Sequence, residues 1–392
     1  MKIAFRITED NRYSFIPIFD TLKRIDEKVE LFTVFDLIKE KELIENIDIL
    51  MFSFTSLGIF EVFRDINLIK SFKRKPLLIA GGPHVSALPH WALDVGFDVV
   101  VVGEAEAVLS ELIRDYAAGN LKKVYKGKSV VPIYSFRFSP YVAPIEIVRG
   151  CPYGCKFCQV SFLFGRTERF RPFESVIDEA KELLRRGRDF VRFIAPNALS
   201  YYAEGKVPNV ALLSELFVRL REAGIKKIYF GSFPSEIRPE YVTESVASLL
   251  RDYVDNRFIA IGVQTGSDRL LSAIGRGHTI EDVKSAVSIL NRYGFTVILD
   301  FLFGLPEEHD EDIAETFSFI EYVLKSYKVK IRAHFFIPLP GTPYGRTPPR
   351  RIPKWALSRI GELARYGVLS GYWYKQSREA FRLWEILLRY QR

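Results

Sequence analysis

Three cysteines lie close together near the middle of the chain, and they are the only cysteines it has. Cys151, Cys155 and Cys158 follow the spacing C-x3-C-x2-C, and glycine and proline residues around them predict a loop. Three thiolates that converge on one loop can hold three irons of a cubane [4Fe–4S] cluster. The fourth iron then has no protein ligand and can accept a substrate or cofactor.

Two other uses of cysteine compete with a cluster. A zinc site needs a fourth ligand, and the nearest histidines in sequence, His84, His90 and His278, are far from the loop. A disulfide framework would leave one of the three cysteines unpaired. The spacing and the absence of a fourth thiol therefore favour an iron–sulfur cluster.

Residues 149–159 resemble the signature of the radical S-adenosylmethionine (radical SAM) superfamily, C-x3-C-x-aromatic-C, with Phe157 in the aromatic position. In that family the open iron chelates the amino and carboxylate groups of S-adenosylmethionine. An electron from a donor such as ferredoxin or flavodoxin then cleaves it to a 5′-deoxyadenosyl radical. The resemblance implies an enzyme with these two cofactors.

The composition bounds the setting of this chemistry. A length of 392 residues predicts two or three domains, and an apolar share of 48% is ample for large cores. No apolar run is long enough for a transmembrane helix, and the first residues are charged too early for a signal peptide. With no cysteine to spare for disulfides, we expect a cytoplasmic protein. Few methionines and cysteines beside many charged residues favour a thermophilic source.

The positive charge is confined to the C-terminal part of the chain. Residues 343–392 carry nine Arg and two Lys against three Glu, a net charge of +8 that equals the net charge of the whole chain. The rest of the chain is therefore neutral overall. Only this C-terminal segment supports an argument about anionic partners.

The elements that must position the cysteine loop begin with an α/β pattern in residues 1–125. Candidate strands span residues 2–7, 29–34, 47–52, 76–80 and 98–102, and crossover helices are expected at residues 14–25, 36–46, 58–73, 89–95 and 105–118. This alternation predicts a doubly wound, Rossmann-like domain with a parallel sheet. Polar and glycine-rich turns follow its strands, where ligands bind in such folds. No G-x-G-x-x-G follows the first strand, which disfavours a dinucleotide site.

Two of these turns, Gly81-Gly82-Pro83-His84 and Val102-Gly103-Glu104-Ala105-Glu106, resemble the cobalamin-binding domain fused to many radical SAM enzymes. The resemblance implies a cobalamin site built from Thr8, Ser53, Thr55, Ser56, Gly81, Gly82, Pro83, His84, Gly103 and Glu104. The Asp-x-His-x-x-Gly element that supplies a lower cobalt ligand elsewhere is missing. Two alternatives stay open: His84 either faces the corrin or caps its loop, and the domain either binds cobalamin or is vestigial.

After a linker at residues 126–144, a β/α rhythm resumes over residues 145–342. Strands are expected at residues 145–149, 190–195, 226–232, 258–264, 296–303 and 329–337, with helices between them. Six β/α units predict a partial barrel, which is also the architecture known for the radical SAM family. Chemistry in such barrels lies at the C-terminal ends of the strands.

Several barrel segments, including Gly262-Val263-Gln264-Thr265-Gly266-Ser267, resemble the methylthiotransferase-type branch of the family. That resemblance implies contacts to S-adenosylmethionine from Phe157, Asn197, Ser232, Gln264 and Ile337. Methylthiotransferases themselves hold a second cluster with three further cysteines, and this chain has none left.

The extension at residues 343–392 is basic and rich in aromatic residues, with helices expected at residues 354–366 and 376–390. Three interpretations fit it. The apolar face of the last helix can pack on the protein, the interleaved arginine and aromatic residues can bind RNA, or the helix can lie on a lipid surface.

The leading hypothesis is a cobalamin-dependent radical SAM C-methyltransferase acting on an unactivated carbon. The alternatives are a radical SAM enzyme that modifies tRNA with a degenerate cobalamin domain, and a cobalamin- or redox-sensing binding protein. The sequence assigns no further catalytic residue and does not identify the substrate.

Overall fold

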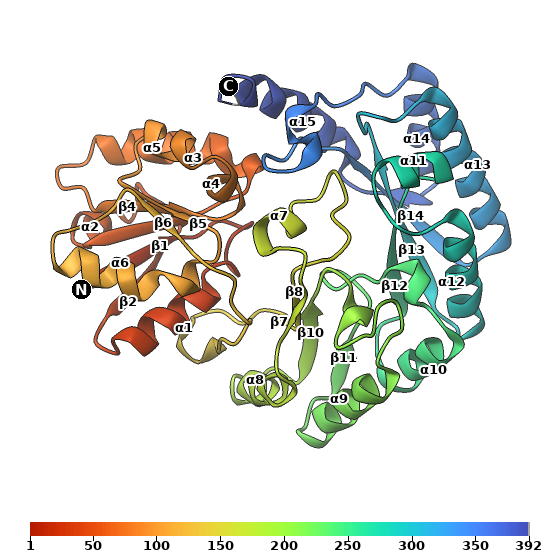
Figure 1. The fold of residues 1–392 in the computed structure, drawn as a ribbon, viewed down its shortest axis with the longest axis horizontal. Helices are drawn as coiled ribbons and strands as arrows, with labels where there is room; N and C mark the ends of the chain where they lie inside the picture. The colour runs from red at the N-terminus through yellow and green to blue at the C-terminus, as the bar shows by residue number, and fades with distance from the viewer. Residues whose placement is uncertain (391–392) are drawn as a thin grey trace.

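The computed structural model describes residues 1–390, in which an N-terminal α/β domain lies beside a curved array of strands with helices on its outer side (Figure 1). The predicted fold class is confirmed. Gln391 and Arg392, the last residues of the predicted C-terminal extension, lie outside the described residues. In the described part of the chain, no helix is both long enough and apolar enough to cross a membrane.

The N-terminal domain is built on a six-stranded parallel sheet with the order β2-β1-β3-β4-β5-β6. Its strands are β1 (Lys2–Arg6), β2 (Glu30–Val34), β3 (Ile49–Ser53), β4 (Leu77–Gly81), β5 (Val99–Val102) and β6 (Val124–Lys126). Along β3, Ile49 and Met51 belong to the hydrophobic core on one face of the sheet, and Leu50 and Phe52 belong to the core on the other. The strands are apolar throughout because both faces are covered. The five predicted strands are confirmed, and β6 adds an edge strand that the sequence pattern did not predict.

Helices cover both faces of this sheet, as predicted for a doubly wound domain. One face packs against α1 (Ile16–Ile25) and α6 (Leu109–Ala117). The other face packs against α3 (Ile59–Lys70) and α5 (Pro89–Val95). The short helices α2 (Lys41–Glu45) and α4 (Pro83–Ala87) complete the domain.

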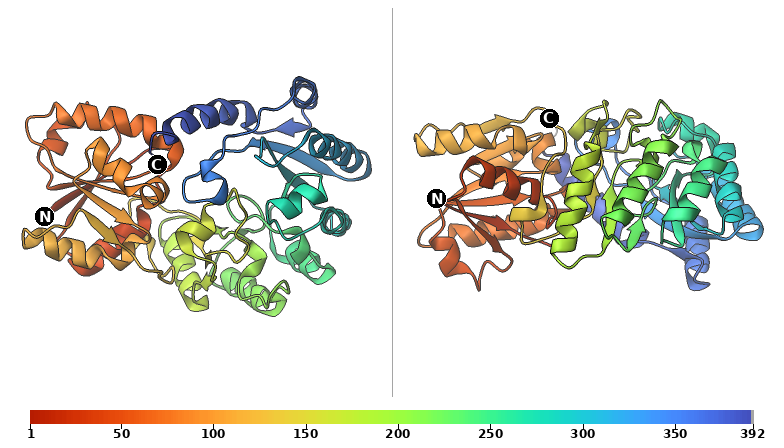
Figure 2. Two further views of the ribbon diagram at one scale, coloured as in Figure 1. Left: turned by 45° about the horizontal axis from the view of Figure 1, so that its top comes forward. Right: turned by 90° about the horizontal axis from the view of Figure 1, so that it is seen from below.

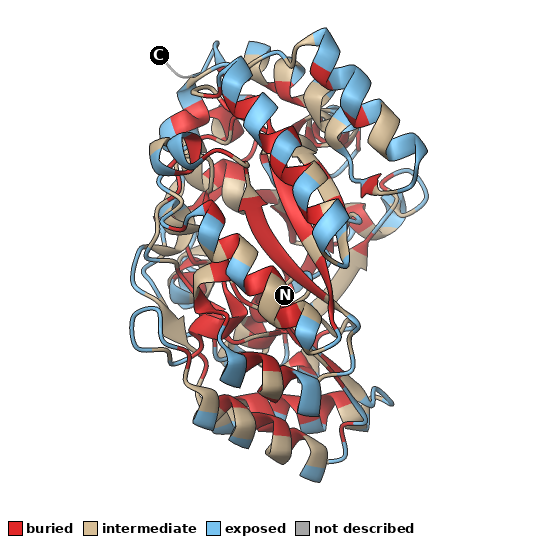
Figure 3. Ribbon diagram, turned by 90° about the vertical axis from the view of Figure 1, so that its right-hand side faces the viewer, coloured by how far each residue is buried: buried red, intermediate tan, exposed pale blue. Residues whose placement is uncertain are grey.

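The second domain is a partial barrel of six parallel β/α units. Its strands are β7 (Ile145–Glu146), β10 (Phe190–Ile194), β11 (Lys227–Tyr229), β12 (Phe258–Gln264), β13 (Thr296–Phe303) and β14 (Val329–Phe335). Its main outer helices are α8 (Phe173–Arg185), α9 (Val210–Glu222), α10 (Glu244–Tyr253), α12 (Ile280–Arg292) and α13 (Asp310–Ser326). Hydrogen bonds from Ala260 N to Gly231 O (2.8 Å) and from Ile237 N to Ala260 O (3.0 Å) join the two halves of the sheet. Figure 3 shows buried residues concentrated on the strands and on the inner sides of the helices.

Short elements lie between the main units. An antiparallel pair, β8 (Val148–Arg149) and β9 (Arg169–Phe170), brackets the cysteine loop and α7 (Val160–Phe164). The helix α11 (Asp268–Ala273) follows β12.

The C-terminal segment packs on both domains. After α14 (Lys354–Arg365), β15 (Leu369–Ser370) pairs in parallel with β14, and α15 (Trp373–Leu387) then runs back to the N-terminal domain (Figure 2). Gly371 has φ +122°, and a Cβ there would lie 2.1 Å from Ala333 O, so only glycine allows this close approach. Two helices were predicted; the strand between them was not, and α15 begins and ends three residues earlier than expected.

Candidate active site

The cysteine loop follows β8 at the start of the barrel. Gly150 has φ +92°, and a Cβ there would lie 2.3 Å from Thr167 O. The loop is further held by Cys151 N, which donates to Gly165 O (3.1 Å), and by Cys158 N, which donates to Cys155 O (3.0 Å). The sequence expectation of a glycine-shaped loop therefore agrees with the structure.

All three cysteines line one cavity of about 140 Å³, where the loop meets β12 and the segments after β10 and β11. Burial raises the pKa of Cys158 to about 11, so metal binding there must displace the thiol proton. Within residues 1–390, no three His, Cys, Asp or Glu side chains are arranged to hold a single metal ion. A cubane cluster makes a different demand, because each thiolate binds its own iron.

A buried arginine lies against this cavity. Arg276 Nη1 is 3.9 Å from Cys155 Sγ, and Arg276 Nη2 donates to Gly262 O (2.8 Å). Its Nε is buried with no hydrogen-bond partner in the described structure. Burial and the nearby Arg238 lower the pKa of Arg276. A guanidinium held in this way is stabilised by an anion in the cavity, and a thiolate-ligated cluster is such an anion.

The structure brings two of the five predicted S-adenosylmethionine residues to the cavity. Phe157 and Gln264 line it. Gln264 stands at an irregularity in β12 with φ +78°, a conformation that costs energy in a non-glycine residue.

The other three do not line it. Asn197 is buried, and its Oδ1 accepts a hydrogen bond from Arg238 N (3.2 Å). It therefore supports the backbone of the cavity wall at Arg238 and does not itself face the cavity. Ser232 closes a turn through its carbonyl, which accepts from Ser235 N (2.9 Å). Ile337 packs between the hydrophobic cores of the two domains.

Sequence reasoning missed three charged residues of the cavity wall, Glu236, Arg238 and Arg276. Glu236 and Arg238 follow β11, so the strand-end rule could have found them. Arg276 lies between two helices, where no local pattern marks a site.

A polar cluster continues from this wall into the barrel. Arg332 on β14 pairs with both Asp300 on β13 and Glu236. His334 Nε2 lies 3.9 Å from Asp300 Oδ1, and Gln376 of α15 contacts His334. Burial and the neighbouring Asp300 raise the pKa of Glu236, and burial raises the pKa of Asp300.

A larger cavity of about 370 Å³ lies between the N-terminal domain and the barrel. Its lining is mostly apolar, with Phe15, Ile18 and Leu109 on one side and Leu163 and Phe164 on the other. The residues predicted for cobalamin that line it are Ser53, Gly81, Gly82, Pro83, Gly103 and Glu104. An adjacent cavity of about 70 Å³ is lined by the predicted Thr8 and Thr55 and shares Ser53 and Pro83.

The glycines of this cavity serve the chain itself. A Cβ on Gly82 would lie 2.8 Å from Phe54 N, and a Cβ on Gly103 would lie 2.8 Å from Gly127 O. Both residues also have positive φ, at +92° and +80°. Neighbouring backbone therefore already excludes a side chain at both positions, whether or not a ligand binds.

His84 and Ser56 do not reach the cavity. His84 is fully buried, its Nδ1 shares a hydrogen bond with Ser56 Oγ (2.9 Å), and its ring packs against Trp91. Burial lowers the pKa of His84 to about 3, so the ring is neutral. The structure thus contradicts the alternative in which His84 faces a corrin, and places it in the core behind the turn.

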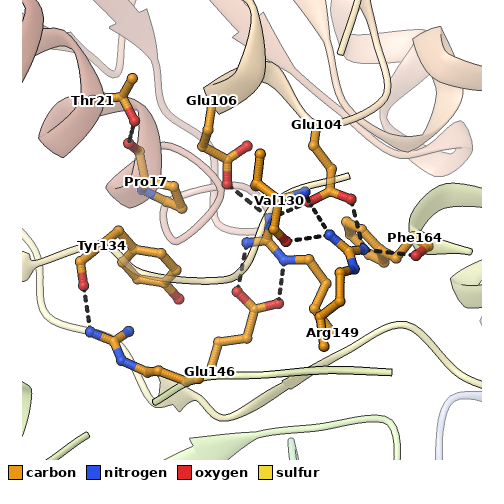
Figure 4. A network of polar contacts seen from close by, with 11 residues as sticks. Pro17, Thr21, Glu104, Glu106, Val130, Tyr134, Glu146, Arg149 and Phe164 are labelled. Carbon is orange, nitrogen blue, oxygen red and sulfur yellow. Dashed lines mark hydrogen bonds and ion pairs between the residues drawn. The ribbon is translucent and has the colours of Figure 1, made fainter. Parts of the chain in front are cut away.

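A buried ionic network joins the two domains at the edge of the larger cavity (Figure 4). Arg149 contacts Glu104 (2.7 Å), Glu106 (3.0 Å) and Glu146 (2.7 Å), and Arg169 contacts Glu104 (2.7 Å). Burial alone would raise the pKa of Glu104. Hydrogen bonds from Arg169 and Arg149 outweigh that effect and hold this pKa below its usual value. Glu104 is therefore ionised and paired.

Two protein-family models match the chain. The model of the radical SAM superfamily matches residues 145–320, and the model of the B12-binding domain matches residues 33–113. The chain therefore contains a radical SAM domain and a B12-binding domain. Domains of these two families take a [4Fe–4S] cluster with S-adenosylmethionine, and cobalamin, as cofactors.

Named relatives agree with this assignment. The radical SAM chain is 25% identical over 284 residues to bacteriochlorophyllide d C-12(1)-methyltransferase of Chlorobaculum tepidum, covering 68% of this chain and 59% of that protein. It is 26% identical over 369 residues to tRNA-2-methylthio-N(6)-dimethylallyladenosine synthase of Pelagibacter ubique, covering 85% and 74%. The chain spans 59% to 66% of the length of three curated relatives that it matches.

A solved structure shares the fold. The radical SAM methyltransferase TsrM from Kitasatospora setae, solved with cobalamin and a [4Fe–4S] cluster bound, superposes with a TM-score of 0.67 at 17% identity. The similarity covers 88% of this chain and 73% of TsrM.

Proposed function

We propose that this chain is a cobalamin-dependent radical SAM methyltransferase that transfers a methyl group to an unactivated carbon. One observation carries the proposal. Residues 149–164 line both cavities: the cysteines face the smaller one, and Arg149, Leu163 and Phe164 face the larger one between the domains. A radical source and a methyl source would thus lie on two sides of one short segment.

We propose that Cys151, Cys155 and Cys158 hold the cluster, with Arg276 compensating its negative charge. When bound, the cluster and S-adenosylmethionine supply a 5′-deoxyadenosyl radical that removes hydrogen from carbon. The chain's own part is to hold these groups and exclude water. Gln264 and Phe157 line the space beside the cysteines, and Asn197 fixes Arg238 in the wall.

We propose that cobalamin lies in the cavity between the domains. When bound, methylcobalamin supplies the methyl group. The apolar side chains of Phe15, Ile18 and Phe164 would exclude water from a planar ring there. No histidine is among the residues that line this cavity in the described chain, so no imidazole of this chain is placed to ligate cobalt from its wall.

Anaerobic reconstitution tests the radical part. With dithionite as reductant, the reconstituted protein should convert S-adenosylmethionine into 5′-deoxyadenosine, and Cys158→Ala should abolish this product. Formation of 5′-deoxyadenosine by Cys158→Ala would refute the cluster assignment.

In cells, we propose a low-potential donor such as ferredoxin or flavodoxin and a cytoplasmic setting.

Purification with hydroxocobalamin tests the methyl part. A corrin absorbance band should stay with the protein through gel filtration, and a methylated product should form with the right substrate. A colourless, cobalt-free protein would refute the methyltransferase function and leave the radical function standing.

A second candidate function is modification of tRNA. The identity to tRNA-modifying relatives and the +8 charge of residues 343–392 favour it. The structure offers a competing use for that segment, because Arg350 and Arg359 pair with Asp310 and Glu321, and Arg382 stacks on Phe60. Salt-dependent tRNA binding that is lost on deletion of residues 346–392 would support this candidate, and no binding at physiological salt would remove it.

A further inference from the structure

Arg149 joins the two cavities through direct contacts. It ends β8 and is covalently followed by Gly150 and Cys151. Its guanidinium reaches into the other domain, where Nη1 donates to Glu104 Oε2 (2.7 Å) and Glu106 Oε1 (3.0 Å). Both glutamates belong to the turn after β5 that lines the cavity between the domains.

The far end of the cysteine loop is held by the same network. The Arg149 guanidinium lies 5.5 Å from the centre of the Phe164 ring, at the end of α7. Arg169 lies opposite Arg149 in the register of β8 and β9. Its guanidinium donates to Phe164 O (2.7 Å) and to Glu104. The network therefore contacts the residues before the first cysteine and the helix after the last one.

The network is densely hydrogen-bonded and shielded from solvent. The side chains of Arg149 and Glu104 are 5% and 3% exposed. Glu146 accepts two hydrogen bonds from Arg149, at 2.9 and 2.7 Å, which fixes the plane of the guanidinium. The backbone at Gly150 is closely packed, because a Cβ there would lie 2.3 Å from Thr167 O. A shift of Glu104 or Glu106 would therefore be passed through Arg149 to the loop that carries Cys151.

We propose that Arg149 is a positioning residue that couples occupancy of the interdomain cavity to the cysteine loop, so that cobalamin and the cluster each strengthen binding of the other. This inference rests on the proposed function, since it assumes that the two cavities hold those cofactors. A corrin would contact the turn at residues 103–106 and Phe164, which the network connects. The first cofactor to bind sets the position of the network, and the second then binds a site whose position is already set.

The test measures hydroxocobalamin binding by absorbance, under anaerobic conditions, to full-length protein with and without a reconstituted cluster. In the wild type we expect the cluster to lower the cobalamin Kd by about fivefold or more, the lower end of typical couplings. In Arg149→Met the two Kd values should converge. Arg149→Lys keeps the charge and loses the planar fork, so it should also lose most of the coupling.

Arg186→Met is the matched control. Arg186 also joins separate segments, through Glu182 (3.1 Å) and the carbonyl of Ser139 (2.7 Å), but it does not line either cavity. It should keep the wild-type ratio of Kd values. A spectroscopic readout complements the titration: cobalamin should shift the electron paramagnetic resonance signal of the reduced cluster in the wild type and in Arg186→Met, and should not shift it in Arg149→Lys.

The outcomes separate the two hypotheses. Wild-type protein that binds cobalamin equally well with and without the cluster refutes the coupling and leaves the proposed function intact. Wild-type protein that binds no cobalamin in either state refutes both. A wild-type ratio retained by folded Arg149→Met or Arg149→Lys refutes the role of Arg149. If Arg149→Met does not fold, Arg149→Lys decides.

Discussion

Removal of one leucine side chain from α15 tests whether the C-terminal helix fastens the two domains together. Leu383 is fully buried within the hydrophobic core of the N-terminal domain, although it belongs to the last helix of the chain. One turn earlier, Ala380 is buried in the core of the barrel. Leu383→Ala therefore leaves a cavity at a contact between parts of the chain that are more than 250 residues apart.

The expected loss is about 2–5 kcal/mol, the range for Leu→Ala at buried sites. The free energy of unfolding falls by about 1–3 kcal/mol per M of urea, so this loss lowers the unfolding midpoint of the N-terminal domain by roughly 1 M or more. Circular dichroism during a urea titration gives the midpoint. The change should not abolish cysteine-loop folding, which depends on other contacts.

Leu388→Ala is the matched control, because Leu388 follows the same helix and is 52% exposed. The free energy of unfolding of Leu388→Ala should stay within about 0.5 kcal/mol of the wild-type value, so its urea midpoint should change little. Equal midpoints for the two variants would refute the docking of α15 on the N-terminal domain. They would also reopen the interpretation of the extension as a free nucleic-acid or lipid binding segment.

Three further predictions concern the candidate site and its surroundings. Gly150→Ala should bind much less iron than the wild type on reconstitution, because its Cβ would lie 2.3 Å from Thr167 O. Gly165→Ala has a similar positive φ and open space around the new Cβ, so it should bind more iron than Gly150→Ala. Equal iron content in the two variants would show that the collision is unimportant. Arg276→Met should make the reduction potential of the cluster more negative in a redox titration, because a buried cation beside Cys155 is lost; an unchanged potential would contradict the assigned role. Burial raises the pKa of Glu308 to about 8. The folded protein therefore holds a proton that the unfolded chain releases above about pH 4.5. The free energy of unfolding of the wild type should then fall as the pH rises from about 4.5 to about 8. Urea midpoints of Glu308→Gln should lack this component of the fall, and identical pH profiles would refute it.

Local sequence patterns predicted much of the fold because they encode local structure. The β/α alternation predicted five of the six strands of the N-terminal sheet and all six strands of the barrel, since buried parallel strands must be apolar on both faces. The strand β15 escaped prediction because two residues carry no periodicity. The glycines at 150 and 154 correctly indicated the cysteine loop.

The candidate site was only partly predictable. Position after a strand identified Gln264 and the turn at Gly103 and Glu104, because strand ends meet at one edge of a sheet. The same rule placed His84 at the cavity, and the structure buries it behind the turn, because Pro83 starts a helix that carries the imidazole into the core.

The sequence by itself determined which chemistry to expect, through three cysteines at a spacing that suits one cluster and no other cysteine in the chain. Only the tertiary structure decided what surrounds those thiols. Arg276 approaches Cys155 across 121 residues, and Arg149 meets Glu104 across 45 residues in another domain. Contacts of this kind depend on how barrel and sheet pack against each other. The periodicity of either segment alone does not contain that information.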